Sequence, residues 1–373
     1  MEKVKINKLS LKRKLGIIFV ILGAFIGAGF ASGSEIYLFF YSFGIKGLIG
    51  ICISSTIIFF IIFKLGNLIK KYNIKNYEEF LEIILKLTKY KNFKKTKTII
   101  LILKNMINIF LIISLFIMFA GFGAYLKQEY NINKYIGSAI LCVLTFFIIL
   151  NDVDEILKVN KIIVPVIIFT IFIVGIKNFE NISDKIDNLY LFNNQGWIIK
   201  SILYGSYNTV LLIPVLISLK EEFKKINKKG ILFISSFSAI IICVISIILF
   251  FLLANLKTCV VDVEMPILYV INEKFNLFKN IYGVIILFSI FTTSISLGIG
   301  ILKNMCNNKK KYPQYAGIMC ITGFIISGFG FSNLVKLLYP ILGYFGIAQL
   351  IAIIFTIWTK NFFIDLLKIQ CYN

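Results

Sequence analysis

Long, nearly uninterrupted stretches of apolar residues dominate the chain, and short polar segments rich in lysine separate them. A continuous apolar run that can cross about 30 Å of hydrocarbon predicts a membrane-spanning helix. A barrel strand would instead alternate apolar and polar residues over about ten positions. The pattern therefore predicts an all-α polytopic membrane protein with ten transmembrane helices. Their ranges are 15–43, 47–69, 98–126, 135–150, 156–177, 194–219, 230–254, 280–303, 315–331 and 333–358.

Two shorter helices are expected outside the spans. Between the second and third spans, apolar residues recur at helical spacing beside charged ones, which predicts an amphipathic helix on the cytoplasmic surface. A second loop helix, on the opposite side of the membrane, is expected around Met265–Phe275. The apolar positions of the first are Tyr77, Phe80, Leu81, Ile84 and Thr88.

Composition agrees with a membrane protein and excludes several chemistries. The 373 residues are 58% apolar and 16% charged, against roughly 25% charged in soluble domains, and the mean hydropathy is +0.88. The absence of histidine excludes His-based triads, His-ligated zinc and His proton relays. Seven scattered cysteines without a CxxC pair imply neither a disulfide framework nor a metal site. We therefore expect neither an enzyme nor a resident cofactor.

The net charge of +22 reports topology rather than nucleic-acid binding. With the N-terminus inside, 29 of the 40 lysine and arginine residues fall on the cytoplasmic side of the ten spans and ten on the other. This bias predicts that both termini are cytoplasmic. The basic loops are attracted to anionic membrane lipid, so the chain is expected to form one integral membrane domain, 1–373, with no nucleic-acid partner.

Ten spans divide into two halves of five, 15–177 and 194–358. Because five is odd, the second half enters the membrane from the opposite side, which is the topology of an inverted repeat. The first helix of each half carries an irregular segment near its midpoint, Gly23–Glu35 with four glycines and Tyr204–Thr209 before Pro214. The pattern predicts that helices 1 and 6 are both broken at the midplane.

A break at that depth has a chemical consequence. Freed backbone amides suit a carboxylate and freed carbonyls suit a cation, and such groups are tolerated in hydrocarbon only where they line a protein cavity. The alternative for the glycines is close helix packing, as in other small-xxx-small segments. In the eighth span, Thr292 and Thr293 can complete a Na⁺ shell or bond back to their own helix.

Three segments resemble the YkvI family of bacterial membrane proteins. They are the stretch Gly23-Ala-Phe-Ile-Gly-Ala-Gly-Phe-Ala-Ser-Gly-Ser-Glu35, the pair Tyr207-Asn208, and Tyr339-Pro340-x-x-Gly343. By resemblance that family belongs to the amino acid–polyamine–cation transporter superfamily. The resemblance implies a LeuT-like fold in the bacterial cell membrane. It also implies a substrate pocket between helices 1 and 6, flanked by the third and eighth helices.

The resemblance carries roles for individual residues. The amides of Gly27, Ala28 and Gly29 match the segment that receives a substrate carboxylate. A sodium site is implied between helices 1 and 8. Some relatives use a proton instead, with a lysine of the fifth helix in the sodium position. Lys158 and Lys161 lie near the start of that helix, so the coupling ion, Na⁺ or H⁺, stays open. The implied sodium ligands are the carbonyls of Gly23 and Ile26 and the hydroxyls of Thr292 and Thr293.

Glu35 is a further candidate, because a carboxylate within a span is costly unless it faces a cavity or a partner. It can bind a substrate amine or carry a proton; the alternative is a glutamate at the outer end of the span, hydrogen-bonded to helix ends. Ser206, Tyr207 and Asn208 complete the expected substrate pocket.

Together these features predict a secondary active transporter, a Na⁺- or H⁺-coupled symporter of a small zwitterionic solute such as an amino acid, working by alternating access. No ATP-binding G-x-x-x-x-G-K-[ST] motif is present. The alternative is a non-transporting, ligand-sensing receptor subunit of the spore-germination permease type. The transporter interpretation depends on the two broken helices lining one pocket.

Overall fold

The computed structural model describes residues 11–87, 93–150, 156–178, 195–256, 263–306 and 308–355. All regular structure in these ranges is helical. Six helices are long and apolar enough to cross a membrane, which confirms an all-helical, multi-pass architecture. They are α4 (Ile45–Tyr72), α6 (Phe93–Tyr130), α10 (Trp197–Ser218), α12 (Lys228–Leu253), α14 (Asn276–Met305) and α16 (Phe331–Phe355).

The first predicted span is interrupted, as its glycines indicate. It consists of α1 (Leu11–Phe25), α2 (Ala28–Ala31) and α3 (Ser34–Phe39), followed by a 3₁₀ turn at Tyr41–Phe43. At the first break the Gly27 N–H bonds to the Phe25 carbonyl at 3.0 Å. An unbroken helix would bond it to the carbonyl four residues back. The prediction of a broken first helix is confirmed.

The prediction that helix 6 is also broken is wrong. α10 continues through Tyr204–Thr209 and past Pro214. Three side chains there bond to the carbonyl four residues earlier and reinforce the turn: Ser206 Oγ to Ile202 (2.7 Å), Asn208 Nδ2 to Tyr204 (3.0 Å) and Thr209 Oγ1 to Gly205 (2.8 Å). Side chains that bond back to their own helix in this way allow a membrane helix to continue past a glycine or a proline.

The glycine in that segment serves helix packing. A Cβ added at Gly205 would lie 3.0–3.2 Å from Ile57 of α4. On the facing helix α16, Gly346 lies directly against the backbone of Ser206. The small residues of α10 and α16 therefore allow the close approach of helices that was the alternative explanation of the pattern.

The remaining described helices are shorter or more polar. α5 (Tyr77–Leu87) and α13 (Pro266–Lys274) confirm that both predicted loop segments are helical, while the side of the membrane on which each lies stays a prediction. Each of the ten predicted apolar stretches contains a described helix, while the count of ten spans, the inverted repeat and the LeuT arrangement stay predictions. The others are α7 (Lys134–Leu150), α8 (Ile156–Asn178), α11 (Lys220–Lys225), α15 (Tyr312–Ser327) and a 3₁₀ turn at Lys309–Lys311.

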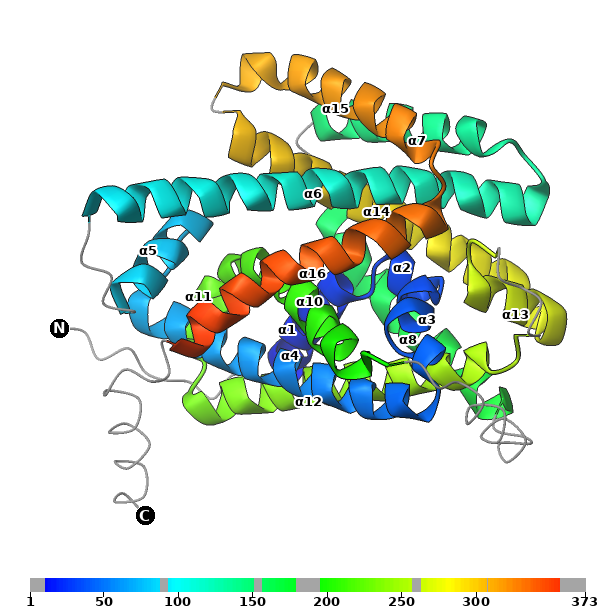
Figure 1. The fold of residues 1–373 in the computed structure, drawn as a ribbon, viewed down its shortest axis with the longest axis horizontal. Helices are drawn as coiled ribbons and strands as arrows, with labels where there is room; N and C mark the ends of the chain where they lie inside the picture. The colour runs from blue at the N-terminus through cyan, green and yellow to red at the C-terminus, as the bar shows by residue number, and fades with distance from the viewer. Residues whose placement is uncertain are drawn as a thin grey trace.

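The long helices lie side by side, with α6 running across the molecule (Figure 1). α7 and α15 pack on one side of α6, and α14 and α16 also contact it. α10 lies between α4 and α16, and α1 contacts α8, α10 and α12. α5 and α13 lie at opposite ends of the bundle (Figure 1), which are called below the α5 end and the α13 end.

The amphipathic helix α5 is covered by protein on its apolar side. Phe80, Leu81 and Ile84 are buried, and α5 contacts α6, α10 and α16. Its apolar stripe therefore packs on the bundle.

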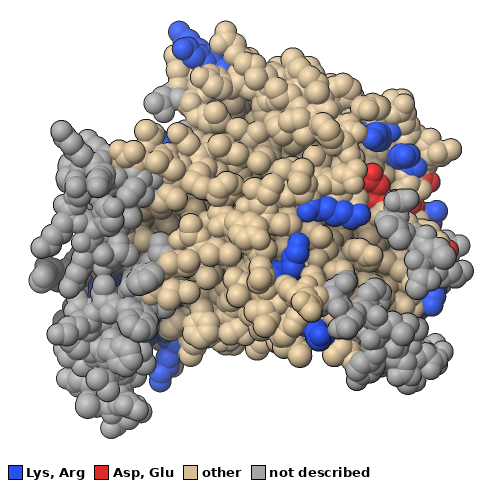
Figure 2. Space-filling view, in the orientation of Figure 1, with Lys and Arg blue, Asp and Glu red and all other residues tan. Residues whose placement is uncertain are grey.

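The outer surface is largely apolar. Most of the face in Figure 2 carries neither basic nor acidic side chains, and the acidic ones visible lie near one margin. Large apolar side chains are exposed on several long helices, which is expected where the surrounding solvent is hydrocarbon. Examples are Phe60 of α4, Leu101 of α6, Ile240 of α12 and Leu337 of α16.

Candidate functional site

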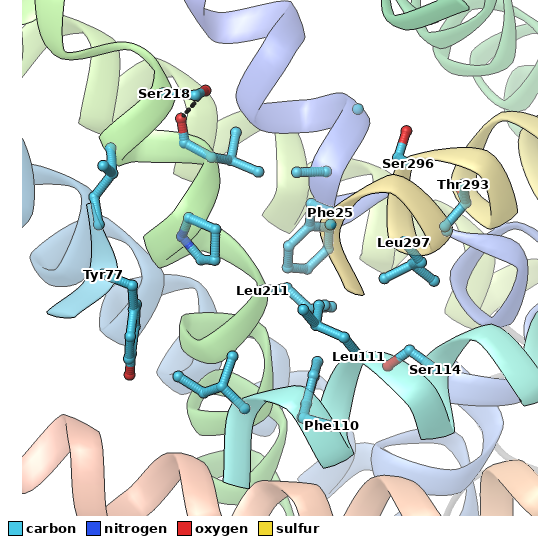
Figure 3. A pocket seen from close by; sticks show the side chains of 18 of the residues that line it. Phe25, Tyr77, Phe110, Leu111, Ser114, Leu211, Ser218, Thr293, Ser296 and Leu297 are labelled. Atoms are coloured by element: carbon cyan, nitrogen blue, oxygen red, sulfur yellow. Dashed lines mark hydrogen bonds between the residues drawn. The ribbon is translucent and has the colours of Figure 1, made fainter. Parts of the chain in front are cut away.

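A cavity of about 870 Å³ runs from the α5 end to the break in the first span (Figure 3). Its walls come from α1, α6, α10 and α14. The apolar lining includes Phe25, Leu111, Leu211 and Leu297, and most polar groups along it are neutral. The polar lining residues are Glu35, Lys75, Asn76, Tyr77, Glu78, Lys104, Asn108, Ser114, Tyr207, Ser218, Thr293, Ser296 and Tyr339.

Glu35 lies at the inner end of this cavity. It is 3% exposed and belongs to the first turn of α3, which begins after Gly33 in a left-handed conformation (φ 82°). The Tyr207 hydroxyl donates a hydrogen bond to Glu35 Oε2. The other carboxylate oxygen lies against Gly29, where an added Cβ would overlap it. The structure thus brings together α2, α3 and α10 at one carboxylate.

Aromatic rings surround that carboxylate. Tyr207 stacks on Tyr339 with ring centroids 5.0 Å apart and on Phe39 at 5.8 Å. Tyr204 meets Tyr207 edge-on at 5.4 Å and Phe25 at 6.0 Å. We call these five side chains the aromatic cluster. Phe25, Tyr207 and Tyr339 present it to the cavity.

Of the remaining residues expected to bind substrate, only one lines the cavity. Gly27 lines the cavity, whereas Ala28 is fully buried and Gly29 lies behind Glu35. Ser206 and Asn208 are buried, bond to their own helix, and are not among the lining residues. The first span and α10 together therefore offer a ligand fewer unpaired backbone N–H and C=O groups than two broken helices would.

Two of the four residues expected to bind sodium line the cavity, and the other two do not. Gly23 and Thr293 line the cavity. The Ile26 carbonyl instead accepts a hydrogen bond from Ser289 Oγ at 3.4 Å. Thr292 Oγ1 bonds to the Phe288 carbonyl at 2.9 Å, as the alternative explanation of this hydroxyl expected.

At the α13 end the structure is closed by hydrogen bonds between distant segments. The Ile267 N–H bonds to the Ser32 carbonyl at 2.9 Å, and the Ser34 hydroxyl bonds to the Glu264 carbonyl at 3.0 Å. The Glu264 carboxylate accepts the Ser332 N–H at 2.7 Å, at the start of α16. α13 and the residues before it are thus joined to both α3 and α16.

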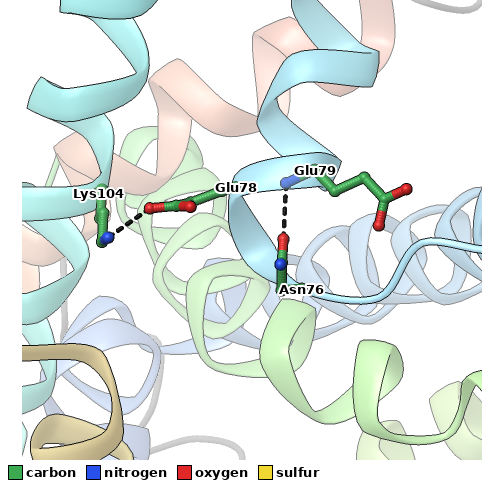
Figure 4. A network of polar contacts seen from close by, with 4 residues as sticks. All are labelled: Asn76, Glu78, Glu79 and Lys104. Carbon is green, nitrogen blue, oxygen red and sulfur yellow. Dashed lines mark hydrogen bonds and ion pairs between the residues drawn. The ribbon is translucent and has the colours of Figure 1, made fainter. Parts of the chain in front are cut away.

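At the α5 end the contacts are polar and exposed. Lys104 of α6 pairs with Glu78 of α5, and Asn76 accepts the Glu79 N–H at 2.8 Å (Figure 4). The side chains of Lys104 and Glu78 are 37% and 49% exposed. The cavity therefore reaches solvent-exposed groups at this end.

Several lining residues were not among the expected site residues. Phe25, Leu211, Ser114 and Ser296 are examples. A signal for part of the wall was present, because Tyr207, Leu211 and Pro214 are spaced four and three apart and so share one face of a helix. That spacing does not say which face meets a cavity.

Comparison with known proteins gives relatives across the length of the chain. The chain is 29% identical over 344 residues to the membrane protein YkvI of Bacillus subtilis (strain 168), and the aligned region covers 89% of this chain and 92% of YkvI. The chain is a multi-pass membrane protein. It is also 25% identical over 340 residues to YyaD of the same organism, covering 90% of this chain and 95% of YyaD. No family model matches the chain.

Proposed function

We propose that this protein is a secondary active transporter of a small amine-bearing solute, such as an amino acid or a related compound. The observation that supports it is the one-sided cavity, which reaches Glu35 from the α5 end while hydrogen bonds of α13 close the other end. Alternating access requires a central site reached from one side at a time, and this shape corresponds to one half of that cycle.

The unbroken α10 changes the basis of the proposal. A paired break in two helices no longer supports it, and the site has one interrupted helix, α1–α3, facing a continuous helix that supplies Tyr207. The solute would be held by side chains more than by freed backbone. Transport by alternating access then rests on the cavity and its closure.

Energy would come from a gradient of Na⁺ or H⁺. Thr293 and the Gly23 segment line the cavity and offer oxygen atoms to a cation, while Glu35 offers a group that exchanges a proton. The side chains of Lys158 and Lys161, the lysine candidates for a proton-coupled site, lie outside the described part of the protein. Both coupling modes belong to the proposal, as does a cytoplasmic location for the α5 end.

A ligand-sensing receptor subunit is the second candidate, favoured by the continuous α10. A receptor needs a cavity that binds and no second, opposite opening. Purified protein in liposomes separates the two. Uptake of a labelled amine or amino acid under an imposed Na⁺ or H⁺ gradient supports the carrier, and saturable binding with no uptake under either gradient supports the receptor.

A further inference from the structure

The inner end of the cavity carries one acid and, among the lining residues, no base. Glu35 is the only ionisable carboxylate or amine there, since Lys75, Glu78 and Lys104 line the cavity at the α5 end. A buried carboxylate is costly unless a cation or hydrogen-bond donors accompany it. Tyr207 supplies one donor. A cationic ligand would supply the missing positive charge.

Part of the backbone that a ligand carboxylate would use is already occupied. The Gly27 N–H bonds to the Phe25 carbonyl, and the Glu35 carboxylate itself covers Gly29. A second carboxylate placed there would lie beside Glu35, and like charges at such short range repel strongly in a medium of low dielectric. The chain thus fills with its own carboxylate the position expected for that of a ligand.

The surrounding rings favour a cation as well. Phe25, Tyr207 and Tyr339 line the cavity together with Glu35, and the face of an aromatic ring attracts an ammonium group. Lys200 lies over the ring of Phe39 at 5.8 Å and is not among the lining residues. No lysine or arginine lines the cavity beside Phe25, Tyr207 and Tyr339, so a positive group there would come from a ligand.

The next stretch of the cavity suits a hydrocarbon chain. Leu111, Leu211 and Leu297 line it from three helices (Figure 3). Asn108, 8% exposed, adds an amide oxygen that has no hydrogen-bond partner among the described residues. An apolar wall with a few acceptors fits an organic amine, whose charged end donates hydrogen bonds.

We propose that the ligand is an organic ammonium ion that lacks a carboxylate, with its ammonium group held by Glu35 and the aromatic cluster. The hydrocarbon part lies along Leu111, Leu211 and Leu297. This rests on the proposed function only in taking the cavity as the ligand site, and it holds for a carrier and for a receptor. Within the class of amino acids and related compounds, it selects the amines.

The test compares matched pairs of probes that differ by one carboxylate. Phenethylamine and phenylalanine, and isoamylamine and leucine, are added to the purified full-length protein, and the dissociation constants are measured by thermal shift. We expect each amine to bind at least about tenfold more tightly than its amino acid, since an unfavourable charge contact costs more than 1.4 kcal/mol. Equal or tighter binding of the amino acids, or no binding by either amine, overturns the proposal.

Variants then assign the effect to Glu35. Glu35→Gln should weaken binding of phenethylamine about 10- to 100-fold. Glu221→Gln should leave it unchanged, because Glu221 is an exposed residue of α11 that does not line the cavity. If Glu35→Gln does not fold, Tyr339→Leu serves instead and should weaken the amine severalfold. Unchanged amine binding in the folded variants overturns the proposal.

Uptake measured separately keeps this inference distinct from the function. Amine binding without uptake under Na⁺ or H⁺ gradients removes the carrier and leaves the inference standing. Gradient-driven uptake of amino acids with no binding of amines removes the inference and leaves the carrier.

Discussion

The Tyr207 hydroxyl on α10 donates its hydrogen bond to the Glu35 carboxylate on α3, joining two segments 172 positions apart. Both side chains are buried and both line the cavity. The pair therefore links the interrupted first span to the continuous helix opposite it. A change of position in either segment is transmitted to the group that we expect to hold the ligand.

Replacing Tyr207 by phenylalanine should reveal the worth of this bond. The ring and its stacking on Tyr339 remain, but a buried carboxylate oxygen loses its donor, which costs about 1–3 kcal/mol. We expect a lower thermal unfolding temperature and weaker binding of phenethylamine. The exposed Tyr344→Phe is the control, and a Tyr207→Phe protein that melts and binds like the parent would contradict the structural role assigned to the hydroxyl.

Two glycines only two positions apart, Gly27 and Gly29, provide a matched pair. A Cβ at Gly29 would overlap the Glu35 carboxylate, whereas a Cβ at Gly27 meets nothing within 4 Å. Gly29→Ala should therefore displace Glu35 and lower amine binding at least about tenfold, a loss of 1.4 kcal/mol or more. Gly27→Ala should retain binding. Equal effects of the two substitutions, measured by thermal shift, would refute the placement of the carboxylate.

The sequence predicted the first span better than the sixth, for a physical reason. In Gly23–Glu35 four glycines leave few side chains to hold a helix, and the structure is interrupted there. In Tyr204–Thr209 a single glycine is flanked by hydroxyl and amide groups that bond back to the helix. Both segments have a composition that is unusual for a helix. The contacts of the second segment with α4 and α16, which the sequence does not specify, accompany a continuous helix.

The candidate site was predictable in part. Glu35 and Tyr207 were expected near one pocket, and the structure brings them together. The aromatic cluster was not expected as a unit, because Phe25, Phe39 and Tyr339 belong to segments whose contact depends on the arrangement of helices. The contact between Glu35 and Gly29, which occupies the expected carboxylate site, also depends on a backbone path that residue spacing does not specify.

Adjacent threonines of α14 should differ in their effect on transport. Thr293 lines the cavity, whereas Thr292 is bonded to the carbonyls of Phe288 and Ser289 within its helix. Removal of one neutral hydrogen-bonding group from the ligand or ion path costs about 0.5–1.5 kcal/mol. We expect Thr293→Ala to lower uptake about 2- to 10-fold and Thr292→Ala to preserve it, measured at several Na⁺ concentrations.

A sodium role makes a stricter demand on the same experiment. If Thr293 contributes an oxygen to a bound Na⁺, the alanine variant should need more Na⁺ for half-maximal uptake. Uptake that is insensitive to Na⁺ in the parent protein removes the sodium site and directs attention to proton coupling through Glu35.

The ion pair between Lys104 and Glu78 should control the cavity entrance more than stability. Exposed pairs of this kind contribute about 0–1 kcal/mol, so Glu78→Lys should leave the unfolding temperature nearly unchanged. Repulsion between two lysines should move α5 away from α6 and speed the reaction of a thiol reagent with a cysteine placed at Ser114, inside the cavity. The double exchange Glu78→Lys with Lys104→Glu should restore the slow reaction, and failure to restore it would show that the pair does not hold the entrance.

The closure at the α13 end predicts the opposite change of access. Glu264 accepts the Ser332 N–H at the start of α16 at 2.7 Å, while its own carbonyl accepts the Ser34 hydroxyl. Glu264→Ala removes an acceptor at a helix N-terminus, which costs about 0.5–2 kcal/mol, and frees α16 from α13. We expect faster amide hydrogen exchange in Pro266–Lys274 and in the first turns of α16, with exchange in α5 unchanged. The hydrogen bond from the Ser34 hydroxyl to the backbone carbonyl of residue 264 remains in this variant, so adding Ser34→Ala should increase the exchange further. If the double variant is as protected from exchange as the parent protein, these bonds do not close this end.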